Sequence, residues 1–354
     1  MKHPILYLLL FIIMSTGSVF SQIQNPTGEL HQPKTEEIWA KTLSGSHYNE
    51  FWNYQFYLND GITVHATFSV ANFGSFKSPV SGVQLSIYNL EGGLYQVSRE
   101  YPIHYLVQDK EQHMFQLRDE RTIYFKGKLP DEHHVKVRFS KDGTQYDVSL
   151  SLKNIQPGLV WGDGFYHIGD EDVGMITHIP FAEAYGYVLV DDIRKDVYGT
   201  AYMDHTYQNE STTRLLHSGY RFVQQQDKDN WEIVNFMLPD NDREKRTVGH
   251  RIKKTEDDIE ITGVESIEHL HESEVFGNRI ARVLDLEMNS SDQIRIIRTE
   301  NNQKFSVLGE LGWLAKSAAR SFLGGEVVNI RGEAVLMENG KRPVNGYYNF
   351  FKIE

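Results

Sequence analysis

Hydrophobic and polar residues alternate along most of the chain in short runs that end at turn sequences. A period of two is typical of strands that bury one face. Asn59-Asp60-Gly61 and Lys141-Asp142-Gly143 separate such runs, and an Asp-Gly pair in this position indicates a hairpin. Because the runs are short and regularly spaced, the pattern predicts an all-β protein of barrels or sandwiches. The predicted strands are 51–58, 62–70, 83–90, 93–97, 104–108, 115–117, 122–129, 135–140, 145–152, 175–180, 184–190, 197–208, 215–226, 231–238, 247–253, 259–266, 280–288, 294–298, 327–337 and 344–353.

Three segments depart from this alternation. Residues 308–323 place apolar side chains on one face at helical spacing, which predicts an amphipathic helix packed against a barrel wall near the C-terminus. A short helix is predicted at 36–43, because Thr35 can cap it. The segment 156–174 is rich in glycine and acidic residues, which favours a solvated loop or a pair of short strands joined by an irregular turn.

The first 21 residues have the pattern of a secretory signal peptide. Lys2 precedes an uncharged apolar run at 5–14, and Val19-Phe20-Ser21 forms a small-residue cleavage site before Gln22. The run is too short for a membrane span, although an uncleaved anchor helix is an alternative. We therefore expect an exported protein, periplasmic or secreted, with no membrane span.

The composition argues against several classes of function. The chain has no cysteine, so thiol nucleophiles and cysteine zinc sites are excluded. The formal net charge is −12, and nucleic acids or anionic membrane surfaces bind clustered cations, so neither partner is expected. His133-His134 and His269-x-His271-Glu272 are possible metal ligands, but a third ligand cannot be assigned to the histidine pairs, so no metal and no cofactor is predicted.

The densest group of titratable side chains lies just past the middle of the chain, at 197–208. If this segment is a strand, Tyr202, Asp204 and Thr206 share one face, and His205 and Tyr207 lie on the other. A phenol beside a carboxylate, with an imidazole behind them, is a possible acid/base group. The alternative is a strand in which the histidine and the aspartate make structural hydrogen bonds.

The same stretch resembles the central motif of the CrtC/AttH lipocalin-like family, a Gly-x-x-Tyr/Trp-x-Asp-His-x-Trp pattern. Gly199, Tyr202, Asp204 and His205 match this pattern, and Tyr207 stands in place of the last tryptophan. The two ends of the chain support the resemblance at 53–56, 331–335 and 345–348, which are similar to the family's first hairpin and closing strands.

The resemblance implies two consecutive lipocalin-like antiparallel β-barrels with a cavity near their junction. The corresponding boundaries are a signal peptide at 1–21, a first barrel at 22–190 and a second barrel at 191–354. Known members include carotenoid and isoflavonoid hydratases, cyclases and lipid-binding proteins, and their reactions need neither a metal nor a diffusible cofactor.

The resemblance also implies site residues. Tyr202, Asp204 and His205 are the expected catalytic residues, together with His178, which corresponds to a histidine that lies upstream of the motif in the family's hydratases. The expected substrate-binding residues are the aromatic and imidazole side chains nearby, namely Tyr207, Trp161, Tyr166 and His167, with His167 as a rival to His178.

Three functions remain open at this point. The first is a hydratase or dehydratase that uses acid/base catalysis at the barrel junction. The second is a non-catalytic carrier of a lipophilic ligand, and the third is dehydration or β-elimination on a uronic acid. The cavity lining separates them, because a polyene requires Leu, Phe and Met, whereas an oligosaccharide requires Arg, Lys, Asn and Trp. The oligomeric state stays undetermined.

Overall fold

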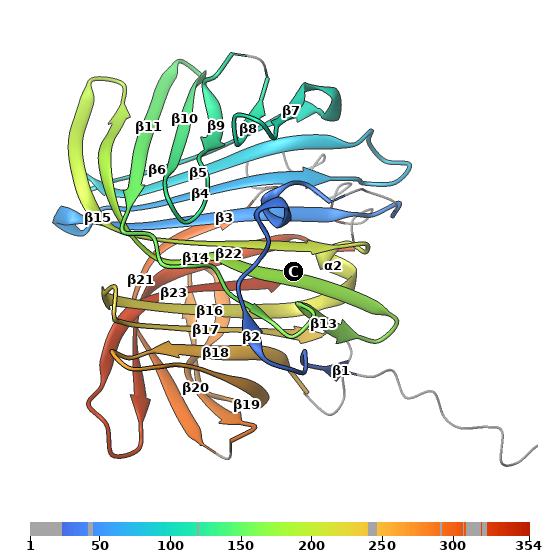
Figure 1. The fold of residues 1–354 in the computed structure, drawn as a ribbon, viewed down its shortest axis with the longest axis vertical. Helices are drawn as coiled ribbons and strands as arrows, with labels where there is room; N and C mark the ends of the chain where they lie inside the picture. The colour runs from blue at the N-terminus through green and yellow to red at the C-terminus, as the bar shows by residue number, and fades with distance from the viewer. Residues whose placement is uncertain are drawn as a thin grey trace, which may run out of the picture.

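The computed structural model describes residues 23–41, 45–118, 120–239, 246–290, 292–306, 308, 320 and 324–354. Two antiparallel β-barrels lie one above the other, as the resemblance implied (Figure 1). The first is a 13-stranded sheet that curls into a nearly closed barrel, and the second is a closed barrel of eight strands. No helix in these ranges is long and apolar enough to cross a membrane.

The first barrel is arranged in the order β6-β5-β4-β3-β15-β14-β11-β10-β9-β8-β7, with β1 and β13 paired at its side. Its strands are β1 (Ile23–Gln24), β3 (Asn49–Leu58), β4 (Thr63–Ala71), β5 (Val80–Leu90), β6 (Gly93–Pro102), β7 (Leu106–Asp109), β8 (Met114–Leu117), β9 (Ile123–Lys126), β10 (His133–Lys141), β11 (Thr144–Lys153), β13 (Phe165–Ile168), β14 (Glu171–Val190) and β15 (Ile193–Gln208).

The second barrel is a meander in which each strand pairs with the next, and its last strand closes on its first. Its strands are β16 (Leu216–Asp227), β17 (Asn230–Pro239), β18 (Val248–Lys254), β19 (Ile259–Val275), β20 (Asn278–Met288), β21 (Gln293–Ser306), β22 (Val327–Glu338) and β23 (Val344–Ile353). The remaining described elements are short: β2 (Leu30–His31), β12 (Val160–Trp161), η1 (Thr35–Ile38), η2 (Asn59–Gly61), η3 (Ile103–Tyr105) and α2 (Thr212–Leu215).

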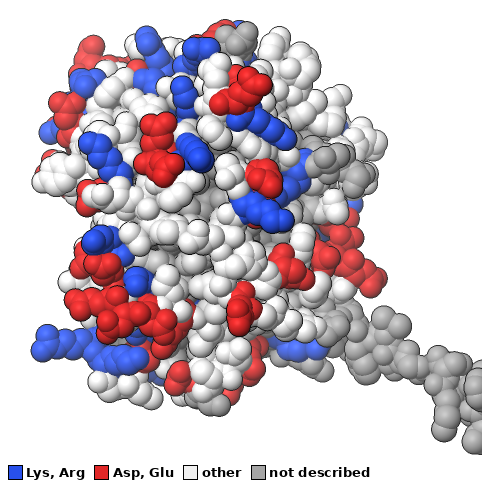
Figure 2. Space-filling view, viewed as in Figure 1, with Lys and Arg blue, Asp and Glu red and all other residues white. Residues whose placement is uncertain are grey.

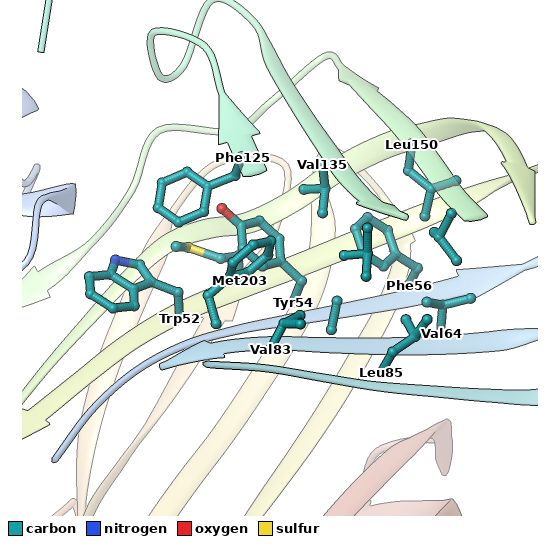
Figure 3. Close-up of a cluster of buried hydrophobic side chains, with 14 of the residues drawn as sticks. Trp52, Tyr54, Phe56, Val64, Val83, Leu85, Phe125, Val135, Leu150 and Met203 are labelled. Carbon is teal, nitrogen blue, oxygen red and sulfur yellow. The ribbon is translucent and has the colours of Figure 1, made fainter. Parts of the chain in front are cut away.

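The core of the first barrel follows directly from the alternation of its strands. Trp52, Tyr54 and Phe56 point inward from β3 and meet Met203 of β15 and Phe125 of β9 (Figure 3). These side chains are almost fully buried, and each large apolar side chain removed from water contributes about 1.5–3 kcal/mol. The outward residues of β3 and β15 are therefore free to form the contact with the second barrel.

Several predicted boundaries need correction. The strands predicted at 175–180 and 184–190 are one strand, β14, whose register shifts on either side of Ile179 form bulges next to Pro180. A bulge tolerates a proline that cannot donate a ladder hydrogen bond. The loop predicted at 156–174 contains β12, β13 and the start of β14, which corresponds to the alternative of short strands.

The short helix predicted at 36–43 is a 3₁₀ turn that ends at Ile38. The indole Nε1 of Trp52 donates to the Ile38 carbonyl at 2.8 Å, so this carbonyl is already bonded to the first barrel. The helix predicted at 308–323 lies almost entirely outside the described residues, as does the signal peptide at 1–21.

The strands divide between the barrels at Leu216 and not at residue 191. The turn at Asp191-Asp192 joins β14 and β15 as a hairpin, and both of these strands pair within the first sheet. Figure 1 shows them running between the two barrels. On the face shown in Figure 2, acidic and basic side chains are intermingled over both barrels, with no continuous basic surface among the coloured residues.

Candidate active site at the barrel junction

The two barrels meet through the outward faces of their strands, where two rows of polar residues face each other. Each row runs across four neighbouring strands, because the pairing register places its members directly opposite one another. The row on the first barrel is Asp204, Asn53, Thr67 and Gln84, and the row on the second is Asn235, Arg221, Asn349 and Arg331.

A cavity of about 170 Å³ lies between these rows, and all of their members except Asp204 line it. Apolar contacts close the junction on either side. On one side Tyr57 stacks on Tyr347 at 4.0 Å, within a cluster that includes Tyr202 and Trp231. On the other side a second apolar cluster includes Met175, which also lines the cavity. Polar groups are thus confined to a small space with apolar surroundings.

Asp204 is fully buried, with an ion pair at one carboxylate oxygen and hydrogen bonds at the other. Its Oδ2 lies 2.5 Å from Nη2 of Arg221 in the second barrel, and its Oδ1 accepts a hydrogen bond from Asn53 Nδ2 at 2.8 Å. Thr67 in turn donates to Asn53 Oδ1 at 3.1 Å. Asp204 is therefore a carboxylate that joins the two barrels and orients Arg221 and Asn53 toward the cavity.

Tyr202 lies beside Asp204 on the same face, as predicted, and its ring is 5.4 Å from the Arg221 guanidinium carbon. Burial, and then the neighbouring Asp204 carboxylate, raise the pKa of Tyr202 well above its ordinary value. The phenol therefore keeps its proton. Neither Tyr202 nor Asp204 lines the cavity, so both lie behind the side chains that form its wall.

Arg331 differs from Arg221 in having no carboxylate partner among the described residues. Its side chain is buried, its Nε has no hydrogen-bond acceptor, and it lines the cavity. Burial, and then Arg221, lower its pKa to about 10, so the guanidinium stays charged at neutral pH. Arg221 Nε and Asn349 Oδ1 also lack partners within the described chain. The guanidinium groups of the two arginines and the amide oxygen of Asn349 therefore remain available to donate to, or accept from, a ligand.

His65 lies in the next outward row of the first barrel, between Gln55 and Ser86. Burial, and then Arg331 and Arg221, lower the pKa of His65 well below its ordinary value. The imidazole is therefore neutral and feels the charges of both arginines, but it is not among the residues that line the cavity.

His205 lies on the opposite face of β15, inside the first barrel. Its Nε2 is 2.7 Å from Oε1 of Glu50, its Nδ1 is 3.1 Å from the Glu37 carbonyl oxygen, and its ring stacks on Trp52 at 4.5 Å. Burial lowers the pKa of His205 to about 3 and raises that of Glu50 to about 7. The pair therefore favours a neutral imidazole and a protonated carboxyl group, away from Asp204.

His178 and Tyr207 accompany His205 inside the first barrel. The His178 ring is stacked 5.7 Å from that of His205, and the Tyr207 ring lies 5.3 Å from it. Gly174 leaves the space that Tyr207 occupies, because a Cβ there would lie 2.2 Å from the phenol ring. The register explains the position of His178: Thr177 pairs with Asp204 and faces the junction, so His178 points the other way.

The other predicted site residues lie apart from both centres. Tyr166 is buried and its hydroxyl is hydrogen bonded to Nδ1 of His250. His167 is partly exposed and lies 2.6 Å from Asp172, and Trp161 Nε1 donates to the Gly28 carbonyl at 3.2 Å. None of these three predicted residues lines the junction cavity.

Within the described ranges, no group of three or more histidine, aspartate or glutamate side chains is arranged to hold a metal ion. The motif His269-x-His271-Glu272 lies on β19, and the carboxylates at 265, 268, 272 and 274 form its solvated polar face.

Sequence reasoning missed Arg221, Arg331, Asn53 and His65. Each occupies the polar position of an alternating strand, which is ordinarily solvent-facing. The available signal was weak: Arg331 and Asn53 both lie in the end segments that resemble the family, but nothing in the sequence pairs them.

Comparisons with known proteins bear on the fold. No protein-family profile and no curated protein sequence matches the chain. An AttH candidate from Nitrosomonas europaea superposes with a TM-score of 0.63 at 11% identity, covering 92% of this chain and 99% of that one. CghA superposes with a TM-score of 0.60 at 12% identity, covering 92% and 97%.

Kievitone hydratase from Nectria haematococca superposes with a TM-score of 0.54 at 10% identity, covering 96% of this chain and 95% of that one. At such identities the likeness concerns the fold alone. The chain therefore has the two-barrel fold of the CrtC/AttH-type lipocalin-like proteins, which its central motif resembles.

Proposed function

We propose that the protein is a hydro-lyase-type enzyme that adds or removes water at a carbon–carbon double bond of a small, hydroxylated carboxylate bound in the junction cavity. The observation that carries the proposal is Arg331, a buried guanidinium that lines the cavity and has no described carboxylate partner. A planar guanidinium binds a carboxylate with two parallel hydrogen bonds.

The cavity lining combines polar side chains with an apolar wall. Two arginines, four asparagines and three threonines line the cavity, whereas apolar atoms, including those of Phe51, Met175, Leu216, Met237 and Phe351, supply most of its exposed surface. Arg221 and Arg331 together carry two positive charges against the single negative charge of Asp204. The excess positive charge favours an anionic ligand. A uronic acid carries both a carboxylate and hydroxyl groups, which can hydrogen bond to the amide side chains.

In this proposal the arginines act as electrophiles, and the base is His65, which does not line the cavity and acts from the next row of the first barrel. In dehydration, the proton on the carbon next to the substrate carboxylate passes to the His65 imidazole, and its electron pair forms the double bond. The bond from the neighbouring carbon to a hydroxyl group breaks, and that hydroxyl takes the proton from His65 and leaves as water. The arginines stabilise the negative charge that develops on the carboxylate, and hydration is the reverse.

In this proposal Asp204 is a positioning residue that holds Arg221, and Tyr202 supports it from behind the cavity wall. Kievitone hydratase, whose name describes water addition, has the same fold and supports this chemistry. Export of the mature chain from Gln22 to the periplasm or medium also remains a proposal, and it would bring the protein into contact with carbohydrate acids.

The test is an assay of the mature protein on a panel of uronic acids and their unsaturated products, followed by the absorbance of the conjugated double bond and by mass spectrometry for a change of one water. Arg331→Met is expected to lower turnover at least 100-fold, and Arg331→Lys to restore only part of it, because lysine cannot form two parallel bonds. Turnover by Arg331→Met at the wild-type rate would contradict the proposal.

A carrier is the second candidate, and one observation favours it. Asp204 is tied into an ion pair and does not face the cavity, as expected for a structural role. His65→Gln separates the two functions. An enzyme keeps substrate affinity and loses turnover in this variant, whereas a carrier shows ligand binding by calorimetry with no turnover even in the wild type.

A further inference from the structure

A second cavity, of about 220 Å³, opens at the end of the first barrel, where η1 meets the β9–β10 loop. No residue lines both this cavity and the one at the junction. Its walls are about equally polar and apolar, and the apolar part includes Ile38 and Trp39 of the η1 segment, Phe125 of β9, and Leu129 and Pro130 of the loop. The flat rings of Trp39 and Phe125 favour a ring-shaped occupant.

His178 lines this cavity and is 3% exposed. Its Nε2 has no hydrogen-bond partner among the described residues. Burial, and then His205, lower its pKa well below the ordinary value, so the imidazole is neutral and can donate or accept one hydrogen bond. A buried polar atom without a hydrogen-bond partner is unfavourable, and a ligand oxygen bonded to Nε2 would remove that cost.

The charged residues that line this cavity are both lysines, although the whole chain carries a net charge of −12. Lys34 and Lys128 line the opening, both are exposed, and neither forms an ion pair with a described residue. No aspartate or glutamate lines the cavity. The Glu37 carboxylate accepts a hydrogen bond from the Lys34 backbone N–H at 2.6 Å but does not line the cavity, so an anionic group there meets two lysines and no carboxylate among the lining residues.

We propose that the mouth of the first barrel is a second ligand site, independent of the junction, for a small aromatic or alicyclic carboxylate. The ring packs against Trp39 and Phe125, the carboxylate lies toward Lys34 and Lys128, and an oxygen at the far end of the ring bonds to His178 Nε2. The site is built from a part of the chain that the proposed hydro-lyase reaction does not use.

The experiment titrates the mature, full-length protein with 4-hydroxybenzoate and, as an uncharged match, 4-hydroxybenzyl alcohol, using isothermal calorimetry at low salt. The double variant Lys34→Gln, Lys128→Gln changes only exposed side chains and is expected to fold normally. We expect it to weaken 4-hydroxybenzoate binding about 10-fold and to leave the alcohol nearly unaffected, since two exposed charges contribute about 1.4 kcal/mol at low ionic strength.

His178→Phe is expected to weaken both ligands about 10-fold, because it retains a flat ring and removes Nε2. Arg331→Met is the control at the junction and should change neither affinity by more than about 2-fold. The proposal is overturned if neither ligand binds saturably, or if Arg331→Met abolishes binding while the lysine variant does not, which would place the ligand at the junction.

Discussion

The two faces of β15 carry adjacent titratable residues that belong to different parts of the molecule. Asp204 faces the second barrel and forms an ion pair with Arg221, whereas His205 faces the interior of the first barrel and is bonded to Glu50. Both carboxylates are fully buried. Asp204 has a permanently charged partner, and Glu50 has a neutral imidazole, so a single strand holds one ionic and one proton-sharing pair.

This difference shows why a dense motif is a poor guide to a single active site. Neighbouring residues of a strand point to opposite faces of the sheet, so two adjacent side chains can belong to different parts of the molecule. Burial therefore has different effects on the charge of the two pairs, because a buried guanidinium keeps its proton whereas a buried imidazole can lose it.

The largest expected effect comes from breaking the ionic pair. Asp204→Asn leaves the Arg221 guanidinium buried without a carboxylate, and we expect the free energy of unfolding to fall by about 3–5 kcal/mol. Urea denaturation at pH 7 measures it. Adding Arg221→Gln to the same chain should recover part of this loss, and equal losses in the single and double variants would refute the ionic assignment.

A smaller effect on the free energy of unfolding is expected for the Glu50–His205 pair. The pH dependence that Glu50 contributes is opposite in sign to that of His205. Because the pKa of Glu50 is raised to about 7, its protonated form contributes stability that is complete below about pH 4.5 and is lost as the pH rises through 7. Glu50→Gln does not titrate, so the stability of the wild type relative to this variant should fall by about 3 kcal/mol between pH 4.5 and 8.

Urea denaturation of both proteins at several pH values tests this expectation. The comparison with the variant removes the contributions of other titrating groups, such as His205, whose lowered pKa destabilises the fold as the pH falls below about 6.5. Parallel stability curves for the wild type and Glu50→Gln would show that Glu50 is ionised at neutral pH.

The smallest expected effect on stability separates the two arginines of the junction. Arg331→Met removes a buried cation that has no described partner, so the free energy of unfolding should stay within about 1 kcal/mol of the wild type or rise. Arg221→Met, the matched variant, should destabilise the protein strongly because it leaves the Asp204 carboxylate buried without its cationic partner. A similar loss in both variants would mean that Arg331 has a structural role.

The sequence predicted most of the strands because alternation is a local property. The hairpins at Asp60-Gly61 and Asp142-Gly143 are confirmed, and so is the division of β15 into a Tyr202–Asp204 face and a His205 face. The break predicted near Pro180 is wrong, because the long partner strand β15 carries β14 through a bulge. The boundary at residue 191 shifts for a related reason, since the hairpin pairs both strands in one sheet.

The site was much less predictable. Asp204 and Tyr202 belong to the junction, but they lie behind the cavity wall, and the cavity is lined by Arg221, Arg331 and Asn53. These three residues come from strands far apart in the chain, and only the register between strands brings them into facing rows. The sequence placed His178 in the same site as Asp204. His178 follows Thr177, which faces the junction, so its side chain points to the opposite face and lines the cavity at the end of the first barrel.

By itself, the sequence determined which residues alternate, where the hairpins turn, that no thiol chemistry is available, and that one strand carries Asp204 and His205 on opposite faces. Only the tertiary structure decided what each of these residues meets. The reason is physical: the direction of a side chain follows from local backbone geometry, whereas its partner, its burial and its proton follow from the packing of distant strands. For Asp204 that packing supplies Arg221, and for His205 it supplies Glu50.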